Sequence, residues 1–189
     1  MLMSGHFAAS LAMLLIAAIL YLVAIGTSSW STSRQELSLG LWRFCMDIEG
    51  DKTWTCLPNN TDFSMAAQAF SMLAVLCYVV SFLMYLAYIV FPSLSKSRPL
   101  TMALCLLVFS IVCLQLMAMI VYGVKMEELH SRAESVHFMQ HLHALNIAWS
   151  FAFAIVSSII ATASGVCTFL ELRNVHLDEL TGAGTMPRI

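Results

Sequence analysis

Four long stretches without a single charged side chain constrain this chain more than any other feature. They cover Met1–Ser33, Phe63–Ser95, Pro99–Val124 and Ile147–Leu170. A bilayer core about 30 Å thick is crossed by roughly 20 helical residues, so each stretch is long enough to span it. Charged residues make up 11% of the chain, whereas a soluble domain carries about a quarter. We therefore predict an all-α membrane protein with a four-transmembrane-helix bundle.

The expected organisation is a single domain over residues 1–189, with spans at 7–29, 64–91, 101–124 and 147–171. A first loop at 30–63, a short loop at 92–100, a second loop at 125–146 and a tail at 172–189 lie outside the membrane. The first apolar stretch could instead be a secretory signal. However, it follows no Lys or Arg, and its apolar part, Phe7–Gly26, exceeds the roughly 7–15 residues of a signal core. We expect it to be retained.

Lys and Arg do not decide the orientation, although they usually collect on the cytosolic side. The short basic loop "PSLSKSRPL" favours the cytosol, but the positive charges are otherwise divided between the two sides. Cysteines are more informative. Cys45 and Cys56 lie in the polar first loop, and the other four lie within apolar stretches, where they act as small hydrophobes. Because disulfides persist outside the cytosol, a Cys45–Cys56 bridge places the first loop outside and both termini in the cytosol.

The first loop also carries a possible modification site. Asn59 and Thr61 form an N-glycosylation acceptor. Such motifs recur by chance, and this one lies close to the second span. Two alternatives therefore stay open: Asn59 carries a glycan, or it is unmodified.

The first loop has the pattern of a small β-sheet. In "ELSLGLWRFC", residues 36–45, leucines alternate with smaller or polar residues, which indicates a strand with one apolar face. "TWTCL", residues 53–57, is β-branched and aromatic, which also favours a strand, and Gly50–Asp51 offers a turn between them. A disulfide closing a loop of about ten residues stabilises such a hairpin by roughly 2–3 kcal/mol in the chain-entropy model.

Tryptophans occur in this loop in a fixed order. Trp30 follows the first span, "GLW" stands at Gly40, Leu41 and Trp42, and the two cysteines come next. The tryptophans could be independent anchors at the lipid–water boundary, but the ordered arrangement resembles the first extracellular loop of the claudin superfamily. The resemblance implies that these residues fix a small disulfide-stapled extracellular antiparallel β-sheet above the four helices.

Several segments resemble one branch of that superfamily. "AAQAFSMLAVL", residues 66–76, is similar to the second helix of the myelin, epithelial and natural killer granule members, whereas claudins usually place arginine at Gln68. "FPSL", residues 91–94, resembles the granule protein, and "GLWRFC" resembles the lens fibre protein and the channel gamma subunits. The end of the chain, "PRI", differs from the aromatic-valine ending of many claudins. We favour the peripheral myelin, epithelial, lens fibre and natural killer granule branch.

Apart from Glu171 at the very end of the fourth, the spans hold no Asp, Glu, Lys or Arg, and such groups usually mark proton relays and ion paths in membranes. This argues against a transporter, a pump or an intramembrane enzyme. Gln68 and Gln115 are expected to form interhelical hydrogen bonds. Ser157, Ala161 and Gly165 form a small-residue ridge that favours packing inside the bundle, with a dimer face as the alternative.

The second loop carries His130, Glu134, His137 and His141, whose spacing would place them on one helical face. Such a stripe could hold zinc or titrate in a mildly acidic compartment. One helix rarely supplies enough converging zinc ligands, so we expect no metal site. The alternative is a solvated helical extension.

These features predict a non-enzymatic protein that organises membrane contacts, cell junctions or vesicle membranes through lateral and adhesive association. An auxiliary gamma-like subunit of an ion channel or receptor is one alternative, and a claudin-type paracellular barrier or pore is another. The expected partners are membrane lipids and other membrane proteins, including further copies of the chain, with no cofactor and no nucleic acid. The expected location is the plasma membrane, or alternatively a secretory granule or vesicle.

Overall fold

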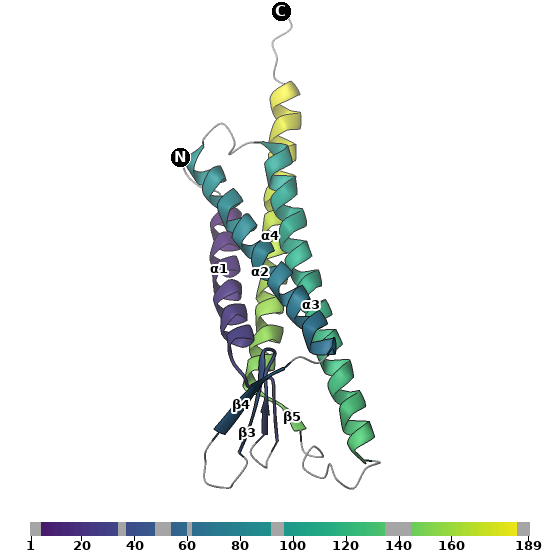
Figure 1. Ribbon diagram of the computed structural model, residues 1–189. Coiled ribbons are helices and arrows are strands. Elements are labelled where there is room, and N and C mark those ends of the chain that lie inside the picture. Colours follow the sequence, from purple (N-terminus) through teal and green to yellow (C-terminus); the bar gives the residue numbers. More distant parts are fainter. Residues whose placement is uncertain are drawn as a thin grey trace, which may run out of the picture.

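A computed structural model describes residues 5–33, 37–47, 54–59, 62–91, 97–134 and 145–184. These residues form four helices and five short strands (Figure 1). All four helices are long and apolar enough to cross a membrane. This confirms the predicted four-helix membrane fold. In chain order the elements are α1 (Gly5–Gly26), β1 (Ser31–Ser33), β2 (Leu37–Leu39), β3 (Arg43–Asp47), β4 (Trp54–Pro58), α2 (Asp62–Val90), α3 (Arg98–Glu134), β5 (Leu145–Ile147) and α4 (Trp149–Gly184).

Local sequence explains several helix ends. α1 ends at Gly26, and the Thr27 hydroxyl donates to the carbonyls of Val23 and Ala24 at 2.9 and 3.2 Å. α2 has Asp62 in its first turn, where a carboxylate favours the positive end of the helix dipole. α3 has a proline in its first turn, where the missing N–H removes no intrahelical hydrogen bond.

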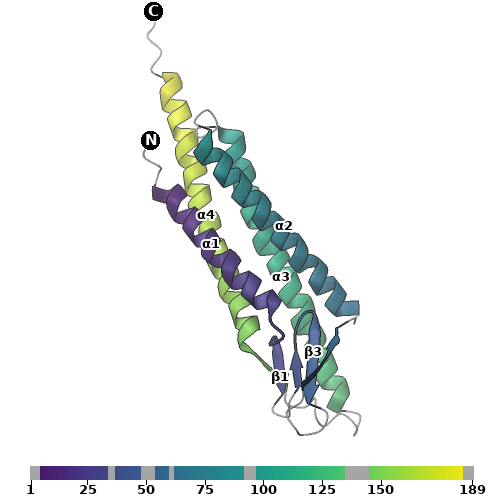
Figure 2. The same cartoon turned by 60° about the vertical axis from the view of Figure 1, so that its left-hand side comes forward.

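The helices form two neighbouring pairs, α1 with α4 and α2 with α3, and α3 also packs against α4 (Figure 2). α1 begins and α4 ends at the end of the bundle opposite the sheet (Figure 1). α3 continues past the membrane span that ends at Val124, alongside the sheet. α4 continues to Gly184 at the other end, so much of the predicted tail is helical.

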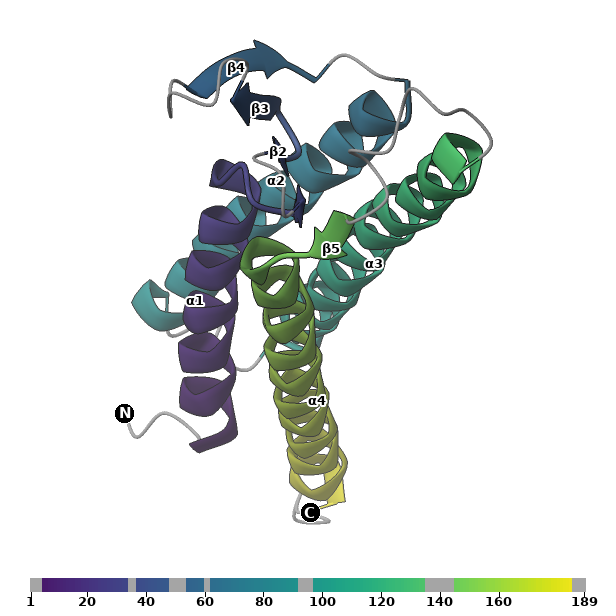
Figure 3. The same cartoon turned by 90° about the horizontal axis from the view of Figure 1, so that it is seen from below.

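The five strands form one antiparallel sheet in the order β4-β3-β2-β1-β5, and it lies across one end of the bundle (Figure 3). The expectation of one continuous strand over residues 36–45 is wrong, because residues 40–42 separate β2 from β3. β1 and β5 were not predicted; they pair with each other, with Ser31 opposite Ile147. The predicted turn at Gly50–Asp51 lies outside the described residues.

A polar layer links the helices at mid-bundle. The side-chain amide of Gln115 donates to the hydroxyls of Tyr78 and Ser157, each at 3.2 Å. Ser157 in turn donates to the carbonyl of Ala17 at 2.8 Å. These contacts include one group from each helix. They show that Gln115 forms the interhelical hydrogen bonds expected of it.

A second polar cluster lies nearer the start of α1. The hydroxyls of Ser10 and Tyr85 are 2.6 Å apart, and Ser10 also contacts Ser164 at 3.0 Å and Thr168 at 2.6 Å. All four side chains are buried. The cluster joins α1, α2 and α4.

The small-residue ridge of α4 faces into the bundle. Ser157, Ala161 and Gly165 are all buried. A Cβ built on Gly165 would lie 3.4 Å from Val108 on α3. The ridge therefore serves close packing between helices of the same chain.

Candidate functional site

Trp30 joins the sheet to the bundle. Its side chain is 1% exposed, and its indole N–H donates to the carbonyl of Ala24 at 2.7 Å. The ring packs edge-on against Tyr122 of α3 and Phe151 of α4, with centroids 4.9 and 5.6 Å away. The Trp30 backbone bonds Leu39 of β2 and Ala148 beyond β5. Trp30 is thus a buried connector and not an independent anchor at the membrane surface.

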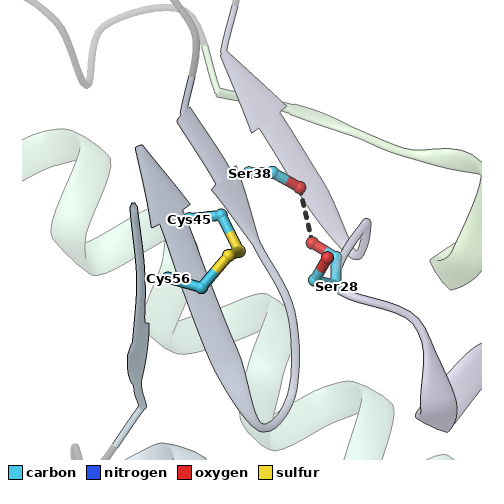
Figure 4. The surroundings of a disulfide bond; sticks show 4 residues. All are labelled: Ser28, Ser38, Cys45 and Cys56. Carbon is cyan, nitrogen blue, oxygen red and sulfur yellow. Dashed lines mark hydrogen bonds between the residues drawn. A yellow bond between two sulfur atoms is a disulfide. The ribbon is translucent and has the colours of Figure 1, made fainter. Parts of the chain in front are cut away.

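Gly40 directly follows β2 and lies against Ser28, in the segment that joins α1 to β1. A Cβ at this position would lie 2.4 Å from the Cα of Ser28 and 3.0 Å from its carbonyl carbon. Both neighbours are backbone atoms, so a larger residue cannot be accommodated by a side-chain rotation. The close approach is held by a hydrogen bond from Ser38 Oγ to the Ser28 carbonyl at 2.6 Å (Figure 4). This explains why glycine occupies the first position of the "GLW" segment.

Leu41 is the buried centre of this segment. Its side chain is 0% exposed, and its carbonyl accepts hydrogen bonds from Ser64 Oγ and Gln68 Nε2, both at 2.8 Å. Gln68 Nε2 also lies 3.2 Å from the carbonyl of Asn59. Gln68 was expected to pack helices together. Instead it fastens the "GLW" turn and the end of β4 to the first turns of α2.

Asn59 completes the set of contacts that we call the loop latch: Gly40, Leu41, Asn59, Ser64 and Gln68. Its side chain is 4% exposed. Its Nδ2, the atom to which a glycan would be attached, donates to the carbonyl of Gly40 at 3.2 Å, and its backbone N–H donates to the carbonyl of Trp42 at 2.9 Å. These contacts fit the unmodified alternative, because a glycan would need this nitrogen to face solvent.

The disulfide predicted between Cys45 and Cys56 is present, with an S–S distance of 2.05 Å (Figure 4). The two cysteines are direct partners in the register of β3 and β4. The bridge therefore fastens the edge strand β4 to the rest of the sheet. The four remaining cysteines, all in described helices, are free thiols.

One row of side chains crosses all five strands of the sheet. Strand pairing aligns Ile147, Ser31, Leu39, Phe44 and Leu57, so all five share one face. Ile147 is 73% exposed and Leu57 is 46% exposed, whereas Ser31 is buried. The two edge strands thus present apolar side chains outward.

The histidine stripe is placed only in part. His130 and Glu134 belong to α3, while His137 and His141 lie outside the described residues. Within the described parts of the chain, no three metal-ligating side chains come together. The stripe stays a prediction.

Sequence reasoning missed the structural roles of Ser64 and Asn59. Ser64 carries no motif, and Asn59 was noticed for its glycosylation pattern alone. The available signal was their position, because both lie close to the junction of the sheet and α2. Polar side chains at such a junction can satisfy carbonyls that a turn leaves unpaired.

A comparison with protein families gives one match. The model of the PMP-22/EMP/MP20/Claudin family matches residues 3–168, which include every residue of the loop latch and the disulfide. A comparison with individually curated proteins found no similar sequence.

Proposed function

Because the chain belongs to the PMP-22/EMP/MP20/Claudin family, we propose that it organises membrane contacts, junctions or vesicle membranes through association with membrane proteins, including itself. It acts without catalysing a reaction. The sheet lies outside the cytosol, in the plasma membrane or a vesicle membrane, and both termini lie in the cytosol. Support for this orientation comes from the disulfide, since such bonds persist in oxidising compartments.

The observation that carries this proposal is the exposed apolar row at both edges of an anchored sheet. Large apolar side chains at Ile147 and Leu57 face outward at the membrane-proximal side of the sheet. Exposed apolar patches mark contact surfaces, and unpaired edge strands can extend onto a neighbour. The loop latch and Trp30 hold these edges at a fixed height above the bundle. The row therefore favours lateral association in one membrane.

The test measures association between two differently tagged copies in one cell by cross-linking and co-purification. Ile147→Asn and Leu57→Asn should each weaken it about fivefold, since a substitution at a contact of this kind costs on the order of 1 kcal/mol. Phe91→Asn is the matched control, because Phe91 is 53% exposed at the opposite end of α2. Equal loss in all three variants, or no loss in any, contradicts lateral association through the row.

Adhesive association is tested by mixing expressing and non-expressing cells. The protein should concentrate at contacts where both cells express it. Two outcomes would replace this proposal. Co-purification with a much larger channel whose currents change identifies an auxiliary subunit, and altered ion flux across an epithelial sheet identifies a paracellular barrier or pore.

A further inference from the structure

A pocket of about 440 Å³ opens where the end of α1 meets the sheet. Its volume lies within the roughly 300–1,000 Å³ typical of small-molecule sites. The Cys45–Cys56 disulfide lies on the same side of the sheet as Ser28 (Figure 4). The described lining residues come from the end of α1 and the two residues after it, from the residue before β3, and from β3 and β4: Gly26, Thr27, Ser28, Trp42, Arg43, Cys45 and Cys56.

Arg43 gives the pocket its charge. Among the described residues that line the pocket, it is the charged one, and its side chain is exposed. It forms no ion pair with any acid in the described parts of the chain. Thr27 is already engaged, since its Oγ1 lies 2.8 Å from Ser150 Oγ and 2.9 Å from the carbonyl of Val23. The pocket thus offers a guanidinium that has no acidic partner among the described residues, which suits an oxyanion with several acceptor oxygens.

The face of α1 below the pocket is apolar and exposed. Leu15, Ile19 and Leu22 are 46%, 61% and 52% exposed, and the same helical stripe reaches Gly26 at the pocket. At about 1.5 Å per residue, Leu15 lies roughly 16 Å below Gly26. One leaflet of the hydrocarbon core is about 15 Å deep. A lipid whose chain follows this stripe therefore has its headgroup at the pocket.

We infer that the pocket binds the phosphodiester headgroup of a glycerophospholipid from the leaflet on the sheet side. Arg43 binds the phosphate, and one acyl chain lies along the Leu15–Ile19–Leu22 stripe. Trp42, 38% exposed, supplies an aromatic wall at the depth where indole side chains prefer to lie. This site requires only insertion in the membrane, so it is independent of the association proposed above.

The test uses the full chain purified in mild detergent and native mass spectrometry of bound lipid. Three probes are added separately: phosphatidylcholine, a diacylglycerol with the same acyl chains, and glycerophosphocholine, which has the headgroup without chains. Phosphatidylcholine should bind at least about tenfold more tightly than either fragment, because one charge-assisted contact is worth about that factor. Equal binding of diacylglycerol overturns recognition of the phosphate. Equal binding of glycerophosphocholine overturns a lipid as the ligand.

Substitution of Arg43 isolates the charge. Arg43→Gln should weaken phosphatidylcholine binding about tenfold, and Arg43→Lys should retain most of it. Arg173→Gln is the matched control, because it removes an exposed arginine at the opposite end of the bundle. Unchanged binding by Arg43→Gln overturns the inference, as does equal loss in the Arg173 control.

A second variant fills the pocket without changing its charge. A Cβ at Gly26 meets no atom within 4 Å, so Gly26→Phe can extend into open space beside the pocket. It should reduce phosphatidylcholine binding to a similar degree. Gly5→Phe is the control, since Gly5 is equally open at the other end of α1. Binding that is unaffected by Gly26→Phe would place the lipid elsewhere.

Discussion

The loop latch and the mid-bundle layer are each built around a glutamine amide, but they use it differently. Gln68 Nε2 donates to the backbone carbonyls of Leu41 and Asn59 and lies 3.1 Å from Ser64 Oγ. Gln115 Nε2 donates to two hydroxyls, and its own Oε1 has no partner among the described residues. Backbone acceptors are fixed in direction, whereas hydroxyls rotate. The latch therefore fixes the position of the sheet, while the layer joins helices that apolar packing already holds.

The largest expected effect comes from removing Trp30, which joins the sheet to the bundle. Trp30→Ala should lower the free energy of unfolding by about 3–5 kcal/mol, as expected for a buried tryptophan, and it removes the shorter of the two hydrogen bonds to the Ala24 carbonyl. Thermal unfolding in mild detergent measures the effect. Trp30→Phe keeps an aromatic ring beside Tyr122 and Phe151 and should cost less. An alanine variant as stable as the wild type would contradict a connecting role.

Removing the disulfide should have the second-largest effect on stability. The paired variant Cys45→Ser with Cys56→Ser is expected to lose roughly 2–3 kcal/mol, because the unfolded chain regains loop entropy. Unfolding with and without reductant gives the same comparison in the wild-type protein. Cys113→Ser is the control, since this thiol is free and lies within a span. Both thiols found free in intact cells would contradict the bond and the orientation together.

The two glutamines can be compared directly with near-isosteric substitutions. Gln68→Met should cost about 1–3 kcal/mol, because it leaves the buried Leu41 carbonyl with one donor fewer. Gln115→Met should cost about 1 kcal/mol or less, since it also removes a buried oxygen that lacks a partner. Unfolding midpoints measured in the same detergent decide the order. A reversed order would contradict the greater stabilisation expected of the Gln68 contacts.

The smallest effect separates the two interpretations of the acceptor motif. Asn59→Ala should cost about 1 kcal/mol by removing the bond to Gly40, and Thr61→Ala removes the motif while leaving Asn59 in place. Both variants destroy the glycosylation motif. Neither should change electrophoretic mobility if Asn59 is unmodified. A mobility increase shared by both would show that the wild-type protein carries a glycan.

The sequence was sufficient for the four helices, since long charge-free stretches allow few other folds. The disulfide and the buried tryptophan were also accessible, because rare residue types stood in a recognisable order. β1 and β5 were not: "STS" and "LNI" are too short to show a period, and their pairing joins segments separated in the chain by α2 and α3. Gln68 was assigned to helix packing because its partner carbonyl lies 27 residues away and carries no sequence signal.

The extent of α3 shows a different limit. The third span was predicted to end at Val124, because charged residues follow it in the sequence. The helix itself continues to Glu134. Charge marks where lipid ends, but helices can continue into water. The sequence left a helical extension open as an alternative because the histidine spacing fitted one.

The pairing of β1 with β5 has a mechanical consequence. β1 follows α1 and β5 leads into α4, and Ser150 N–H donates to the Ser29 carbonyl at 3.3 Å between them. The end of α1 and the start of α4 are therefore held together by backbone hydrogen bonds of the sheet. A force applied to the sheet by a neighbouring molecule therefore acts first on α1 and α4 together. Separating those two helices at this end requires breaking the hydrogen bonds between β1 and β5.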